Sequence, residues 1–162
     1  MWSDVVLRAE QLHLLQLLFW GALSVVSGTG TLLFAAVKLR GTSLLRPFAL
    51  QTTIWGALEL LLAGVAYRSL ALRDIAGTAR LERTAWLFLG LYLGIVAVGV
   101  TLAIAAWRFA GRDPSPHGGH TSAIQTGFTP RALSTIGAGI GVALQGLALA
   151  VLQLLFVAHV SR

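Results

Sequence analysis

The chain has 162 residues, of which 56% are hydrophobic and only 11% are charged. Soluble domains usually carry about 25% charged residues, so this composition excludes an ordinary soluble domain and indicates a membrane protein. The net charge of +6 comes from basic residues at the ends of apolar segments, which favours lipid headgroups and argues against nucleic acid as the partner.

Four apolar segments are each long enough for the roughly 20 residues that a helix needs to cross a bilayer. They cover residues 14–37, 48–71, 85–107 and 133–158. None alternates with the two-residue period of a strand, and helices satisfy every backbone polar group within lipid. The sequence therefore predicts an all-α fold in which residues 1–162 form one membrane domain, a four-transmembrane-helix bundle.

The connections between these segments differ in length and composition. The first two are short and basic, whereas residues 111–130 form a long polar loop rich in Gly, Pro, Ser and Thr, with room for a docking segment outside the membrane. The 12 Lys and Arg residues divide equally between the two sides, so the positive-inside rule does not decide the orientation. The even number of spans favours both termini in the cytoplasm.

The two halves of the chain also resemble each other in part. LFWGALSVVSGTG (18–30) aligns with LFLGLYLGIVAVG (87–99), and PFALQTTIWG (47–56) aligns with PRALSTIGAG (130–139). Such matches are expected from two parallel copies of a helical hairpin. Chance similarity between helices rich in Leu, Ala and Gly is the alternative, and both interpretations stay open.

The order of WGALSVVSGTG, WGALELLLAG, LERTAWLFLGLYLG and GAGIGVALQGLALAVLQ resembles an uncharacterised bacterial family of small four-helix integral membrane proteins, classed as a domain of unknown function. The resemblance covers nearly the whole chain and includes the Gln145-Gly146 pair. It implies a four-helix fold in the bacterial inner membrane, and it implies no activity. In that family the position of Glu59 tends to be an amide, and acidic residues tend to occur where this chain has Tyr92 and Gln153.

Glu59 is the only acidic residue within a predicted span. Helical spacing places it on a face that also carries small residues, which points it toward the other helices and away from lipid. A neutral Glu59 can donate a hydrogen bond to a serine or an amide at a similar depth. The sequence thus predicts an intramembrane polar cluster of Glu59, Gln145, Ser24 and Ser27.

Glycines at four-residue spacing occur on two of the spans. Gly90 and Gly94 on the third span, and Gly137 and Gly141 on the fourth, predict faces for close helix packing. The GAGIG run (137–141) is not a nucleotide-binding loop, because it follows no strand and lies within a membrane span.

The four histidines are candidate ligands for a cofactor or a metal. His13 and His159 lie at the same side of the membrane and could ligate one haem or metal, but two interfacial residues with polar tips are the favoured interpretation. His117 and His120 in the long loop are close enough to share a metal, but a third ligand is missing. The sequence therefore predicts no cofactor and no metal.

Catalytic groups are scarce in this chain. It has no cysteine, and we find no Ser/His/Asp set, paired catalytic carboxylates or phosphate-binding loop, so we do not expect an enzyme. The first function class is a structural, accessory or assembly subunit, whose partners are the lipid bilayer and other membrane subunits or a second copy. The second is a proton- or ion-linked small-molecule carrier organised around Glu59. A hydrated cavity at Glu59 would favour the carrier, and tight packing there would favour the subunit.

Overall fold

A computed structural model of the chain describes residues 2–38, 43–72, 74–109 and 129–160. These ranges contain four α-helices and no strand: α1 (Trp2–Lys38), α2 (Leu45–Arg68), α3 (Ile75–Phe109) and α4 (Pro130–Val160). Each helix is long and apolar enough to cross a membrane. The predicted all-α, four-helix architecture is therefore confirmed.

The helices are longer than the predicted spans at several ends. The largest differences are at the starts of α1 and α3, which begin at Trp2 and Ile75, where the apolar pattern gave 14 and 85. Local capping explains the early start of α3, because the Asp74 carboxylate accepts a hydrogen bond from the Gly77 N–H at 2.7 Å. Caps of this kind extend a helix into polar sequence that hydropathy alone does not mark as a span.

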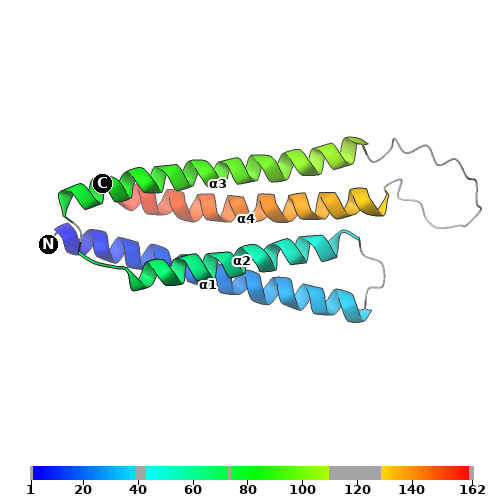
Figure 1. The fold of residues 1–162 in the computed structure, drawn as a ribbon, viewed down its shortest axis with the longest axis horizontal. Coiled ribbons are helices and arrows are strands. Elements are labelled where there is room, and N and C mark those ends of the chain that lie inside the picture. The colour runs from blue at the N-terminus through cyan, green and yellow to red at the C-terminus, as the bar shows by residue number, and fades with distance from the viewer. Residues whose placement is uncertain (1, 39–42, 73, 110–128, 161–162) are drawn as a thin grey trace, which may run out of the picture.

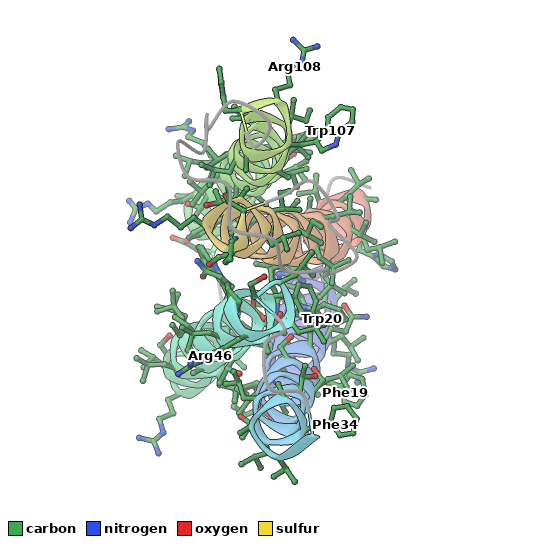
Figure 2. All side chains as sticks on the ribbon, turned by 90° about the vertical axis from the view of Figure 1, so that its right-hand side faces the viewer. Phe19, Trp20, Phe34, Arg46, Trp107 and Arg108 are labelled. Carbon is green, nitrogen blue, oxygen red and sulfur yellow. The ribbon has the colours of Figure 1, made fainter. Side chains whose placement is uncertain are left out.

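The four helices form two antiparallel hairpins, α1 with α2 and α3 with α4 (Figure 1). The start of α1 and the end of α4 lie at the same end of the molecule (Figure 1). Viewed along the helices, α3 lies at one edge, followed by α4 and then by the α1–α2 hairpin (Figure 2). The hairpins meet through α4, which packs against α2 and less extensively against α1. The bundle is consequently open, and α4 is its most buried helix.

Close backbone contact at glycine holds each hairpin together. In the first hairpin, a Cβ atom at Gly56 would lie 2.8 Å from the Gly21 carbonyl oxygen. In the second, a Cβ atom at Gly99 would lie 2.6 Å from the carbonyl oxygen of Gly139. Any larger side chain at these positions would force the helices apart, so both hairpins depend on the missing Cβ.

The two glycine contacts also show which positions of the hairpins correspond. Gly56 and Gly139 play the same part on α2 and α4, in agreement with the sequence alignment of those helices. On α1 and α3 the packing and the alignment disagree. The alignment pairs Gly21 of α1 with Gly90 of α3, but the glycine of α3 that contacts its neighbouring helix as Gly21 does is Gly99. A hairpin repeat, if present, has a different register in its first helix from the one that matching letters suggested.

The helix-packing prediction for α3 is wrong within this chain. Gly90 and Gly94 are exposed, and a Cβ atom at either would meet nothing within 4 Å. The physical reason is that α3 has a single main neighbour, α4, and turns its Ala85, Leu89 and Gly99 face toward it. On α4, Gly137 and Gly141 are buried and pack against α2, at Leu44 and at Phe48 and Gln51 respectively.

We expect the same substitution at two glycines of α3 to have opposite effects. Gly99→Ala places a methyl group 2.5 Å from the Ala143 backbone nitrogen and should lower the free energy of unfolding by about 1–3 kcal/mol. Gly94→Ala enters open space, so its better helix propensity should leave stability unchanged or raise it by up to about 1 kcal/mol. Unfolding in mild detergent followed by circular dichroism measures both values. Equal effects of the two substitutions would contradict the observed face of α3.

Candidate functional site

The Gln145 side chain connects three helices in the centre of the bundle. It is 1% exposed and extends from α4 toward α1 and α2. Its Oε1 accepts a hydrogen bond from the Trp20 indole N–H at 2.8 Å, and its Nε2 donates to the Ser24 hydroxyl at 2.9 Å. Nε2 also lies 3.4 Å from the Thr52 carbonyl oxygen of α2. The amide therefore joins the two hairpins by hydrogen bonds as well as by packing.

The structure brings together only part of the predicted polar cluster. Ser24 is buried and bonded to Gln145, so these two members of the predicted cluster do meet. Ser27 is exposed, and its hydroxyl donates to the Ser24 carbonyl oxygen of its own helix at 3.3 Å. Trp20 was not included in the predicted cluster, although it lies four residues before Ser24 and thus on the same helical face.

Glu59 is buried but stands apart from this cluster. It is 7% exposed, on the α2 face that also carries Thr52 and Gly56. Neither carboxylate oxygen of Glu59 has a hydrogen-bond partner among the described residues. The predicted hydrogen bond to Gln145 or to a serine is therefore absent. Glu59 follows Thr52 by seven residues, which is about 10 Å along the helix axis and beyond the reach of Gln145.

Tyr92 of α3 is the polar side chain that the structure associates with Glu59. It is half-buried and interacts electrostatically with the carboxyl group. Tyr92 also stacks on Phe88, with 6.1 Å between the ring centroids. A carboxyl group sealed at this depth can hold a proton, and the Tyr92 phenol is a second group that can donate one. The pair supplies neither a nucleophile with its base nor a set of metal ligands.

A second polar contact lies nearer the end of the molecule where α1 begins. Gln153 of α4 is buried and donates from Nε2 to the Ala85 carbonyl oxygen of α3 at 3.1 Å. Gln153 also interacts with His13 of α1, whose ring stacks on Phe156 with 4.4 Å between centroids. Sequence reasoning noted Gln153 only through the family resemblance. Its position eight residues after Gln145, just over two helical turns, was a signal that it faces the interior.

The histidines are not brought together as a ligand set. His13 is buried among helices, and its Nδ1 has no hydrogen-bond partner among the described residues. His159 is exposed, with its Nδ1 2.8 Å from the Leu155 carbonyl oxygen of its own helix. Within the described ranges no group of three or more His, Asp or Glu side chains could hold a metal ion. His117 and His120 lie outside the residues that the structure describes.

An apolar groove runs between α1 and α4 on the outside of the bundle. Its volume is about 650 Å³, and it lies between residues 12–20 of α1 and residues 144–152 of α4. Its walls are formed mainly by leucines and aromatic rings: Leu12, Phe19, Trp20, Leu144, Leu147 and Leu152. Figure 2 shows Phe19 and Trp20 projecting on one side of the bundle, near the junction of these helices. Glu59 does not line this groove.

No protein-family model, curated protein or solved structure matches the chain. The resemblance to a bacterial four-helix family therefore stays a prediction from the sequence.

We expect Gln145→Leu to destabilise the bundle, because it leaves the Trp20 N–H and the Ser24 hydroxyl without their partner. Hydrogen bonds between membrane helices are worth about 0.6 kcal/mol on average and up to about 1.7 kcal/mol. A double-mutant cycle of Gln145→Leu with Trp20→Phe should therefore give a coupling energy in this range. Gln16→Leu, at an exposed position of α1, is the control and should leave stability unchanged. A coupling energy of zero would show that the bond contributes nothing.

The lack of a hydrogen-bond partner at Glu59 changes which substitution we expect this position to tolerate best. If Glu59 joined helices by a hydrogen bond, glutamine would replace it better than leucine. Because its oxygens are buried without a partner, Glu59→Leu should raise the free energy of unfolding by about 1 kcal/mol or more and should be at least as stable as Glu59→Gln. Thermal unfolding in detergent compares the three proteins. A clear loss of stability in Glu59→Leu alone would restore the hydrogen-bonding interpretation.

Proposed function

We propose that this chain is a structural or accessory subunit that assembles, within the bacterial inner membrane, with other membrane proteins or with a second copy of itself. It performs no chemistry of its own in this proposal. Its role is to present helix surfaces to a larger complex and to hold that complex in a defined arrangement.

The observation that carries the proposal is the outward face of α3. This helix has one main neighbour, and the face opposite its contact with α4 is lined by small exposed residues: Gly90, Gly94, Ala97 and Thr101. Small residues at this spacing are enriched where membrane helices meet, since they allow backbones to approach closely. A face of this kind at the edge of an open bundle is suited to a further helix.

The interior of the bundle supports the same conclusion. Gln145 and Gln153 are both buried, and both use their amide groups to bond to neighbouring helices. Their hydrogen-bonding capacity therefore serves to join helices and not to bind a solute. These two buried amides therefore contribute to helix association within the bundle.

A substitution on the outward face of α3 tests the proposal. Wild-type protein extracted from its native membrane in mild detergent should migrate as a complex larger than the 17.2 kDa chain. Gly94→Ile should abolish this complex without unfolding the chain, because the new side chain meets nothing within the bundle. Gly30→Ile on α1 is the matched control, since it also enters open space and should keep the complex. A wild-type protein that migrates as a solitary chain would contradict the subunit role.

One observation favours a second function, a proton- or ion-linked carrier. Both oxygens of the Glu59 carboxyl group are buried without a hydrogen-bond partner among the described residues, so no described contact accounts for an ionisable group at a depth where such groups mark proton and ion pathways. The carrier function predicts proton flux in liposomes reconstituted with wild-type protein and its loss in Glu59→Gln. Flux that depends on Glu59 would replace the subunit proposal, and equal background flux in both proteins would exclude a proton-carrier role.

A further inference from the structure

The groove between α1 and α4 has a rigid apolar floor that faces the surroundings of the bundle. The Trp20 ring forms part of it, and the hydrogen bond from the indole N–H to Gln145 fixes that ring in place. Leucines from both helices form the walls, and only Gln16 adds a second polar side chain. In a membrane such a groove is filled by hydrocarbon.

A cationic side chain lies where the groove ends. The α1 face that carries Leu12, Leu15 and Phe19 continues one turn toward the start of the helix to Arg8, which is exposed. The groove face of α4 continues in the same way to His159, which is also exposed. Both residues lie at the end of the bundle where α1 begins and α4 ends (Figure 1). The apolar groove thus leads to an arginine and an imidazole ring.

The distances along α1 match one leaflet of a bilayer. Trp20, the middle residue of α1 (Trp2–Lys38), is bonded to Gln145, the middle residue of α4 (Pro130–Val160), and we place this level at the membrane midplane. Arg8 precedes Trp20 by 12 residues, which is about 18 Å along the helix axis. One leaflet contributes about 15 Å of hydrocarbon, half of the roughly 30 Å core. Arg8 is therefore placed at the level of the phosphates when Trp20 is at the midplane.

The groove is open along one side and follows about two turns of α1. It spans residues 12–20 of that helix, which is about 12 Å of helix axis. An extended hydrocarbon chain can lie along an open apolar groove of this kind. The cationic Arg8 one turn beyond its end favours a chain that carries an anionic head over a purely apolar helix.

We propose that this groove is a binding site for an anionic phospholipid of the leaflet at the end where α1 begins. One acyl chain lies in the groove against Trp20, and the phosphate contacts Arg8, with His159 beside it. A guanidinium group pairs with two phosphate oxygens at once, and a headgroup without the positive charge of choline does not repel it, which explains a preference for an anionic headgroup. The site requires only that the helices span a bilayer, and it is independent of the proposed assembly through α3.

Native mass spectrometry of the detergent-purified protein tests the site, with phosphatidylglycerol and phosphatidylcholine as probes. Wild-type protein should retain one phosphatidylglycerol molecule and bind it more tightly than phosphatidylcholine. Arg8→Gln should weaken phosphatidylglycerol binding about fivefold, the loss expected for one basic residue near an anionic surface. Leu147→Trp, which fills the groove from an exposed position, should abolish retention of both lipids.

Two matched variants control for general effects of charge and bulk. Arg83→Gln removes an exposed arginine at the same end of the bundle, and Leu61→Trp adds a ring at an exposed position of α2. Both should bind lipid as the wild type does. Equal affinity for the two lipids, an equal loss in Arg83→Gln, or retention in Leu147→Trp would each overturn the proposal. A wild-type dimer that Leu147→Trp dissociates would show instead that a second copy occupies the groove.

Discussion

The buried amide of Gln145 is the interaction on which the arrangement of the two hairpins depends. In a bilayer, apolar side chains gain little by leaving lipid for a neighbouring helix, so helices associate through close packing and hydrogen bonds. The hairpins meet along α4, and Gln145 lies on that helix with bonds to α1 and to the backbone of α2. It reaches α2 because Gly141 and Gly137, about one and two turns earlier, let the two helices approach closely.

Glu59 shows the opposite use of a polar group. It is as deeply buried as several residues of the interior, yet the described structure gives its oxygens no hydrogen bond. Leaving such a group without a partner costs free energy that an apolar residue of the same shape would not. A carboxyl group present at such a cost indicates a property that depends on its proton. A direct measurement of proton flux therefore tests the carrier alternative.

The small-residue face and the apolar groove belong to different parts of the bundle. The small-residue face lies on α3 at one edge, whereas the groove lies between α1 and α4 (Figure 2). A partner helix on α3 and a lipid against α1 would therefore not compete for the same residues. Assembly and lipid binding can be measured independently, and the variants Gly94→Ile and Leu147→Trp separate them.

The sequence by itself determined the number of helices, their approximate bounds and the inward direction of Gln145 and Ser24. These properties are local, because length, hydropathy and a 3.6-residue period suffice to mark a helix and its polar face. Only the tertiary structure decided which face of α3 packs, since glycines occur on more than one side of that helix and either side could accept a neighbour. It also separated Glu59 from Gln145, because the axial register between α2 and α4 depends on contacts such as Gly141 with Phe48 and not on the pattern within one helix.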